Sequence, residues 1–243
     1  MYLTQTSKIF RPDLIEQNEP IKMEDVEEVK IDVEDGLFLR GVYKKSKNSD
    51  APIIIYFGGN ADDATRIVEH LKGLNDFDIV AFNYRGFVNS DGKPSEDTLF
   101  GDALKIYEKF KKDKTIIMGR SLGSGVATFV ASKRRLDGLI LITPYDSILS
   151  IAQKKYPYLP ICLLLKHKFE STKYIKNVTA PVGLIEVKFD DVIPKYHFEK
   201  LKKRVSNLAL HVVFEDCTHG SVLEHSDFEK TISKMLKMFR IGM

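Results

Sequence analysis

Runs of uninterrupted apolar residues alternate with helical segments along most of the chain. The apolar runs predict strands at 53–57, 79–82, 115–118, 139–142, 182–187 and 208–214. A strand that is apolar at every position is buried on both faces, so such strands separated by helices indicate a mostly parallel sheet covered by helices on both faces. The pattern therefore predicts an α/β fold.

The first two predicted strands follow a different pattern. Residues 26–33 alternate between polar and apolar, and Asp35-Gly36 separates them from a second run at 37–43. An Asp-Gly pair between two such runs is typical of a β-hairpin. We therefore expect an antiparallel N-terminal hairpin that joins the parallel strands in one mixed sheet. The residues before it, 1–25, are expected to be irregular.

Residues 145–178 fit the alternation least well, because they contain the stretch 156–165, which is aromatic and apolar and is interrupted by Pro157 and Pro160. One interpretation is a core helix packed on the sheet. The other is a short helical cap insertion, since the segment follows a strand end, where the active sites of open sheets lie. We favour the cap. A chain of 243 residues can bury the core of one α/β domain without needing a second, so we expect a single domain over 1–243.

Composition excludes some classes of partner. The chain has 37 basic and 34 acidic side chains and a formal net charge of +3, which gives no electrostatic case for nucleic acid. Basic runs at 109–112 and 200–204 are typical of solvated helix ends. A second interpretation is peripheral contact with an anionic membrane surface.

Cysteine usage gives neither a disulfide framework nor a metal site, because Cys162 and Cys217 are the only two cysteines. Residues 1–11 lack the basic start and apolar run of a signal peptide, and no apolar run has the length of a membrane span. We therefore expect a reducing, cytoplasmic setting. No metal or organic cofactor is indicated.

The strongest chemical signal is Gly119-Arg120-Ser121-Leu122-Gly123. It lies between the predicted strand 115–118 and the small, apolar residues 124–131, which read as a buried helix. A strand, a Gly-x-Ser-x-Gly turn and a helix form a nucleophile elbow, in which the serine is held in a strained conformation at the carboxyl end of the sheet. The flanking glycines remove Cβ atoms that would clash there. Ser121 is the expected nucleophile.

A serine hydroxyl needs a general base. Of the six histidines, His219 lies in a loop after the last predicted strand, from which it can reach a serine at the carboxyl edge of the sheet. His70 and His197 lie within helical patterns and His211 within a strand, so we expect them to be structural. His225 is the nearest rival to His219.

The base needs a carboxylate to orient it. Asp190 and Asp191 follow the predicted strand 182–187. We choose Asp190 and keep Asp191 as the alternative, with Asp146, one strand earlier, as an outside candidate. A helix N-terminal charge before Pro194 would be the structural role of Asp191.

The developing oxyanion needs preorganised N–H donors. One should be the backbone amide of Leu122, directly after the nucleophile. The loop 57–62 follows the first parallel strand and contains Gly58-Gly59, which lets the backbone approach a substrate closely. The amide of Asn60 is the expected second donor.

The chain contains four motifs in the order in which they occur in the α/β-hydrolase superfamily. It resembles in particular the small branch with an N-terminal hairpin and a short cap. That branch includes depalmitoylase-like, lysophospholipase-like and serine-aminopeptidase-like proteins. Gly58-Gly59-Asn60-Ala61 is similar to its His-Gly-Asn-Ala oxyanion loop, with Gly58 in place of the histidine. Residues 83–95 are similar to its Asp-Tyr-Arg-Gly-x-Gly-x-Ser-x-Gly-x-Pro-Ser run, from which Asn83 and Val88 depart.

The other two motifs concern the candidate triad. Residues 119–125 match the elbow, and the order Ser121, then Asp190 or Asp191, then His219 is that of the superfamily. The resemblance places the acid four residues before Pro194, which points to Asp190, and His219-Gly220 falls where the family has its histidine. Residues 186–189 replace the His-Gly that usually precedes the acid. The resemblance runs from about residue 26 to the end.

The expected function is that of a serine hydrolase that cleaves a small-molecule carboxylic ester or thioester through an acyl-enzyme intermediate. The apolar cap favours an acyl chain over a peptide. One alternative is a peptidase or amidase with the same triad, which would need an acidic pocket for a free amine; Glu170 and Asp146 are the acidic residues near the cap. The other is a catalytically silent hydrolase fold that serves as a binding protein.

Overall fold

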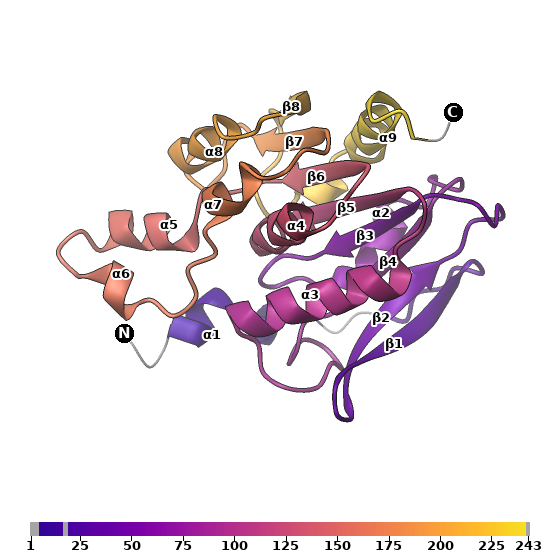
Figure 1. Ribbon diagram of the computed structural model, residues 1–243, viewed down its shortest axis with the longest axis horizontal. Helices are drawn as coiled ribbons and strands as arrows, with labels where there is room; N and C mark the ends of the chain where they lie inside the picture. Colours follow the sequence, from indigo (N-terminus) through magenta and orange to yellow (C-terminus); the bar gives the residue numbers. More distant parts are fainter. Residues whose placement is uncertain (1–4, 17–18, 242–243) are drawn as a thin grey trace.

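A single mixed sheet crosses the molecule in the computed structural model, which describes residues 5–16 and 19–241 (Figure 1). Within this part of the chain the strand order is β1-β2-β4-β3-β5-β6-β7-β8. The strands are β1 (Val26–Glu34), β2 (Leu37–Lys44), β3 (Ile53–Phe57), β4 (Asp78–Phe82), β5 (Thr115–Arg120), β6 (Gly138–Ile142), β7 (Val182–Val187) and β8 (Leu208–Phe214). β2 is antiparallel to both β1 and β4, and the other pairs are parallel. The predicted mixed sheet is confirmed.

The turn of the hairpin explains its sequence signal. Asp35 and Gly36 join β1 to β2 with φ values of 23° and 89°. Positive φ at both central residues matches the turn to the right-handed twist of the strands, and only small residues such as Asp and Gly adopt it readily.

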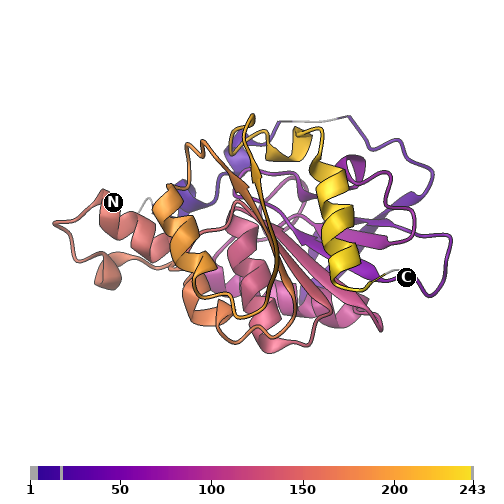
Figure 2. The ribbon, with the colours of Figure 1, turned by 90° about the horizontal axis from the view of Figure 1, so that it is seen from above.

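Helices cover both faces of the sheet (Figures 1 and 2). One face packs against α3 (Glu96–Phe110), α4 (Leu122–Lys133), α7 (Ser171–Ile175) and α8 (Lys195–Lys202), and the other against α2 (Ile67–His70) and α9 (Phe228–Met238). Alternate residues of β3 belong to the two cores, Ile53 and Ile55 to the first and Ile54 and Tyr56 to the second. This two-sided burial is the reason for the uninterrupted apolar runs.

The first part of residues 145–178 forms the predicted cap, and the second part packs in the core. α5 (Ile148–Lys155) and α6 (Ile161–Leu164) project beyond the carboxyl edge of the sheet, as a cap would (Figure 1). α7 packs against α4, and Phe169 and Ile175 are fully buried in the first core. The second half of the segment is therefore core, and only α5 and α6 stand out from the body.

The N-terminal segment is more regular than its sequence predicts. It contains the short helix α1 (Gln5–Ile9) and a 3-10 turn at Pro12–Leu14, whereas residues 1–4 and 17–18 of the predicted irregular stretch lie outside the described residues. Phe10 is buried, with its ring 5.1 Å from that of His167 and 6.2 Å from that of Phe169. The burial of Phe10 holds α1 in place. The residues that bury it, His167 and Phe169, are distant in the sequence, so the local pattern could not predict this helix.

None of the helices within residues 5–16 and 19–241 combines the length and the apolar character needed to cross a membrane.

Candidate active site

Ser121 stands between the end of β5 and the first residue of α4. Its backbone has φ 47° and ψ −118°, a conformation that L-residues rarely adopt. The amide of Ser121 donates to the carbonyl oxygen of Ile142 at 2.9 Å, which ties the turn to the neighbouring strand. The strained turn expected of a nucleophile elbow is present.

Both glycines of the elbow are required by close contacts. A Cβ atom on Gly119 would lie 2.3 Å from the carbonyl oxygen of Gly123, and one on Gly123 would lie 2.1 Å from that of Phe57. These distances are far below a van der Waals contact. The predicted reason for the glycines, close packing of strand against helix, is confirmed.

The structure brings Ser121, His219 and Asp190 together in one chain of hydrogen bonds. Nε2 of His219 lies 2.9 Å from Oγ of Ser121, and Nδ1 lies 2.8 Å from Oδ2 of Asp190. Ser121 is 8% exposed and His219 is 6% exposed. The other carboxylate oxygen of Asp190 accepts the amides of Val192 at 2.9 Å and Ile193 at 2.6 Å, so the turn after β7 holds the carboxylate in place.

The rival acids lie elsewhere. Asp191 is exposed, although it is next to Asp190. Asp146 is fully buried, with Oδ1 2.7 Å from Nδ1 of His197 and Oδ2 2.7 Å from Nζ of Lys200. Of the three carboxylates considered, Asp190 is the one hydrogen-bonded to His219.

The remaining histidines have other partners or positions. His70 ends α2, and His225 pairs with Asp216 at 2.7 Å and stacks on Phe214. Burial lowers the pKa of both His70 and His167. A histidine that stays neutral because it is buried fits a structural role.

The sequence did not reveal a pair of charged residues beside the candidate triad. Arg120 and Asp62 form an ion pair at 2.6 Å, and Nη2 of Arg120 donates to the carbonyl oxygens of His219 at 2.9 Å and Gly220 at 3.0 Å. Oδ2 of Asp62 accepts the amide of Gly59 at 2.7 Å. One buried guanidinium therefore connects the elbow, the loop after β3 and the histidine loop. The signal available in the sequence was an arginine at the variable position of the elbow.

The two predicted oxyanion donors lie on flanking elements. The amide of Leu122 is the first of α4, and the first amides of a helix have no acceptor within it. Asn60 lies in the loop after β3, and its carbonyl oxygen accepts the amide of Arg11 at 2.8 Å. The N-terminal segment thus fastens the loop that carries the second predicted donor.

The two departures from the family's second motif have different structural consequences. Nδ2 of Asn83 donates to Oδ1 of Asp63 at 2.9 Å, whereas an aspartate at this position would place two carboxylates together. Val88 has φ 49°, in the left-handed region that favours the glycine of the family motif.

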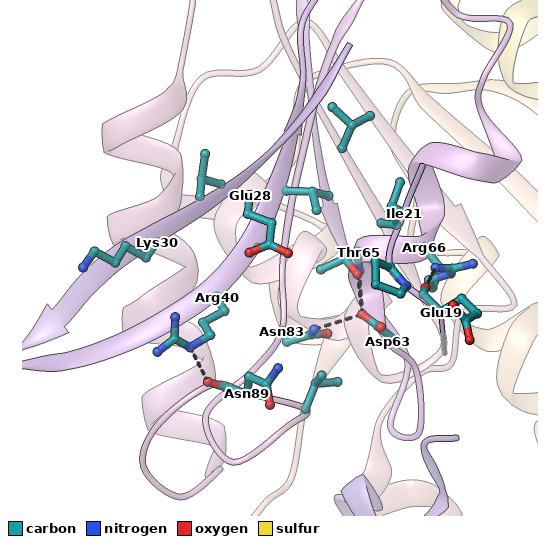
Figure 3. A pocket seen from close by; sticks show the side chains of 16 residues that line it. Glu19, Ile21, Glu28, Lys30, Arg40, Asp63, Thr65, Arg66, Asn83 and Asn89 are labelled. Carbon is teal, nitrogen blue, oxygen red and sulfur yellow. Dashed lines mark hydrogen bonds between the residues drawn. The ribbon is translucent and has the colours of Figure 1, made fainter. Parts of the chain in front are cut away.

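Figure 3 shows a separate cleft of about 480 Å³ between the β1–β2 hairpin and the turn after β3. Its polar groups bind one another: Oδ1 of Asp63 accepts from Asn83 at 2.9 Å and from Oγ1 of Thr65 at 2.6 Å, and Nε of Arg40 donates to the Asn89 carbonyl at 2.8 Å. None of the three candidate catalytic side chains lines this cleft.

No group of His, Cys, Asp and Glu side chains in the described part of the chain is arranged to hold a metal ion. Cys162 is exposed and Cys217 is partly buried, and both are free.

Comparison with known proteins identifies the family. The profile of the alpha/beta hydrolase fold matches residues 53–160. The uncharacterized protein Rv2307c of Mycobacterium tuberculosis is 30% identical over 203 residues, which cover 79% of this chain and 72% of that protein. The chain belongs to the α/β-hydrolase superfamily. The expected resemblance is thereby confirmed.

Some α/β-hydrolase relatives carry an assigned activity. The lysophosphatidylserine lipase ABHD12 of Danio rerio is 32% identical over 181 residues, which cover 63% of this chain and 47% of that protein. The chain therefore spans about half the length of this relative.

Solved structures of other α/β-hydrolases share the fold. Est1E from Butyrivibrio proteoclasticus, solved with ferulic acid, superposes with a TM-score of 0.68 at 18% identity, over 86% of this chain and 99% of that one. A bacterial membrane phospholipase A superposes with a TM-score of 0.69 at 14% identity, over 90% of this chain and 88% of that one.

Proposed function

We propose that this protein is a serine hydrolase that cleaves carboxylic esters, with lipid-type acyl esters as its substrate class. The observation that carries the proposal is the hydrogen-bonded chain from Ser121 through His219 to Asp190. Its three members come from the carboxyl ends of β5 and β7 and from the loop after β8, and the nucleophile stands on a strained turn. This arrangement matches the geometry of a Ser-His-Asp triad.

In the proposed acylation step, Nε2 of His219 takes the proton of Ser121 as the serine oxygen attacks the acyl carbon. Asp190 keeps the other ring nitrogen protonated and stabilises the imidazolium that forms. The amides of Leu122 and Asn60 bind the oxyanion of the tetrahedral intermediate. When the intermediate collapses, His219 gives its proton to the departing alcohol.

Deacylation repeats these roles with water. His219 removes a proton from a water molecule, the resulting hydroxide attacks the acyl-serine carbonyl, and the acid is released as Ser121 regains its proton.

The preference for a lipid-type substrate is supported by an apolar groove between α1, α5 and α6. The groove has a volume of about 240 Å³, and most of its lining is aliphatic: Ile9, Ile148, Ile151, Ala152, Ile161, Leu164 and Leu165. An alkyl chain gains free energy in such a groove, whereas the polar backbone of a peptide does not. The activity of the ABHD12 relatives on a lysophospholipid points to the same class.

The two acidic residues near the cap give no support to the amidase alternative. The carboxylate of Asp146 is fully buried and is bound by His197 and Lys200. Glu170 is half-buried and lies 3.9 Å from Nζ of Lys173. The carboxylate of Asp146 is therefore already neutralised by its own partners, and that of Glu170 lies beside a lysine.

The direct test is Ser121→Ala, assayed with p-nitrophenyl butyrate and labelled with a fluorophosphonate probe. We expect a loss of roughly 10⁴-fold or more in kcat and no labelling, because the nucleophile is gone. Ser132→Ala, at the far end of α4, is the control and should behave as wild type. Wild-type turnover by Ser121→Ala would show that the nucleophile is misassigned.

Two further measurements separate the alternatives. Folded wild-type protein that the probe does not label would favour the silent binding protein. A series of acyl esters, the matching thioesters and amino-acid amides would assign the substrate class, and we expect the esters with longer acyl chains to have the highest kcat/KM.

A further inference from the structure

The end of the cap exposes an unusual amount of apolar surface. Residues 154–166, which we call the cap tip, comprise the last turn of α5, the α5–α6 connection and α6. Within the cap tip Tyr158 is 98% exposed and Leu163 is 82% exposed, and Leu159 and Leu164 are also exposed. Single exposed leucines are ordinary, but four large apolar side chains within seven residues form a patch that indicates an interaction surface.

The patch continues along the carboxyl edge of the sheet. Phe189 and Val192 flank Asp190 in the loop after β7 and are exposed, as is Tyr196 at the start of α8. Nζ of Lys154 lies 5.1 Å from the ring centre of Tyr196, so the cap tip and α8 adjoin. Exposed apolar groups thus gather on the side of the molecule where Ser121 lies.

Residues 147–169, which include α5 and α6, carry charge of one sign only. Lys154, Lys155, Lys166 and Lys168 lie between Asp146 and Glu170, and no acidic residue occurs between those two positions. Lys154, Lys155 and Lys166 are exposed. These 23 residues therefore carry four positive charges, whereas the whole chain has a net charge of +3. Exposed apolar side chains ringed by lysines are complementary to an anionic lipid interface.

The cap tip is anchored to the protein at its base. Nε2 of Gln5 donates to the carbonyl oxygen of Leu164 at 3.2 Å, and its Oε1 accepts the amide of Lys166 at 2.6 Å. Ile161 is buried beneath the patch. Helix α1 therefore holds the tip from below, and Figure 1 shows α1, α5 and α6 together beyond the sheet edge.

We infer that the cap tip docks on an anionic phospholipid bilayer, with Tyr158 and Leu163 inserted and the lysines against the headgroups. This inference deepens the proposed function, because docking by this edge turns the face that carries Ser121 towards a lipid-ester substrate. Of the two basic runs that the sequence suggested for membrane contact, 109–112 lies at the end of α3 and is not part of this surface. The run 200–204 begins beside it, with Nζ of Lys200 6.0 Å from the ring centre of Tyr196.

The experiment is flotation of purified protein with two kinds of vesicle. One consists of phosphatidylcholine alone, and the other contains ~30 mol% phosphatidylserine as the anionic lipid. We expect wild type to float with the anionic vesicles and to be released by ~0.5 M salt, because screening shortens the range of the lysine charges. Leu163→Asp and Tyr158→Asp should each weaken binding by about tenfold or more, since each removes a buried apolar side chain from the lipid.

Matched controls lie on other surfaces. Leu208→Asp, at the amino end of β8, and the pair Lys234→Gln with Lys237→Gln, on α9, should leave binding unchanged. Lys154→Gln combined with Lys155→Gln should weaken binding by about tenfold or more. Thermal denaturation and hydrolysis of p-nitrophenyl butyrate establish that each variant is folded, and both should be unaltered in Tyr158→Asp and Leu163→Asp.

Several results would overturn the inference. One is the absence of wild type from the anionic vesicle fraction, and another is an equal loss of binding in Leu208→Asp and Leu163→Asp. A wild-type dimer in solution that Leu163→Asp dissociates, with no vesicle binding, would assign the patch to a second copy of the chain. Ser121→Ala should float like wild type, so failure of docking and failure of the proposed catalysis can be told apart.

Discussion

Arg120, the variable residue of the elbow, donates from Nη2 to the backbone carbonyl oxygen of His219 at 2.9 Å. The same side chain pairs with Asp62, which accepts the amide of Gly59 in the loop that precedes Asn60. The residue beside the nucleophile thus fixes the position of the proposed base and of the loop that supplies a proposed oxyanion donor.

We expect Arg120→Gln to lower kcat/KM for p-nitrophenyl butyrate by roughly 10²-fold, because a small displacement of the base removes much of the benefit of its orientation. Most of the loss should fall on kcat, and Arg120→Lys should restore part of it by keeping the charge beside Asp62. Stopped-flow labelling with a fluorophosphonate gives a second measure. Unchanged kinetics in a folded Arg120→Gln protein would contradict the positioning role.

The neighbouring aspartates provide a matched pair of variants. Asp190→Asn should reduce kcat by roughly 10⁴-fold, because an amide cannot hold His219 in the required tautomer. Asp191→Asn should change kcat by less than about twofold, since the Asp191 side chain is exposed. The steady-state rates of the two variants decide the assignment, and the opposite order of effects would transfer the role to Asp191.

The elbow glycine Gly123 should not tolerate a methyl group. In Gly123→Ala the new Cβ would lie 2.1 Å from the carbonyl oxygen of Phe57 and 2.4 Å from that of Gly58, and both are backbone atoms that cannot move alone. We expect a loss of at least about 2 kcal/mol in the free energy of unfolding, measured with urea. Gly101→Ala, in α3 with open space around it, should instead gain about 0.5–1 kcal/mol.

Val88 stores backbone strain that a glycine would release. Its φ of 49° is costly for a β-branched residue, and about half of the side chain is exposed, so little packing is lost on its removal. Relief of about 1–2 kcal/mol, less the conformational entropy of glycine, should raise the free energy of unfolding of Val88→Gly by up to about 1 kcal/mol. Val88→Ala keeps the positive φ, and a melting temperature equal to that of Val88→Gly would argue against strain as the cause.

The buried histidine His167 should make the free energy of unfolding fall as the pH decreases below about 6.5, the ordinary pKa of histidine. Burial lowers the pKa of His167 in the folded protein, so the unfolded chain binds the proton more tightly. The stabilisation is therefore complete above the unfolded pKa and is lost below it, with a limit of about 1.4 kcal/mol per pH unit for each such histidine. Urea unfolding between pH 7.5 and pH 5.5 measures the slope.

The contacts of His167 indicate which region responds. Nδ1 lies 3.3 Å from the amide of Glu96, which it accepts, and Nε2 lies 3.1 Å from Oγ1 of Thr6. Protonation of Nδ1 would remove that acceptor, so hydrogen exchange at the amide of Glu96, the first residue of α3, should accelerate at the lower pH. His167→Gln should reduce the pH slope, and an unchanged slope in that variant would place the titrating group elsewhere.

Local sequence was sufficient for the sheet and for the candidate nucleophile. Three predicted strands, 53–57, 182–187 and 208–214, coincide with β3, β7 and β8. β3 and β7 are buried on both faces, which requires mostly apolar residues, whereas β8 lies at the edge of the sheet and is partly exposed. The five residues of the elbow were enough to predict the strained turn at Ser121, whereas the contacts of Gly123 with Phe57 and Gly58 come from the neighbouring strand β3 and the loop after it. The convergence of Ser121, Asp190 and His219 could be predicted because strand ends of a parallel sheet share one edge, and their catalytic roles stay a prediction.

Contacts between distant segments could not be predicted in the same way. Nothing near Gln5 in the sequence indicates a helix that holds residues 164–166, and nothing near Arg120 indicates that its partners are Asp62 and the carbonyl of His219. The division of 145–178 into a projecting part and a core part also depends on a distant contact, the packing of α7 against α4.

Spacing and periodicity are properties of neighbouring residues, so they were enough to predict the strands of the sheet, the elbow and the short set of acids and bases. Which member of that set contacts which depends on how distant segments pack together. Adjacent side chains such as Asp190 and Asp191 point in different directions from one turn, and the fold alone brings His219 within 2.9 Å of a serine 98 positions earlier.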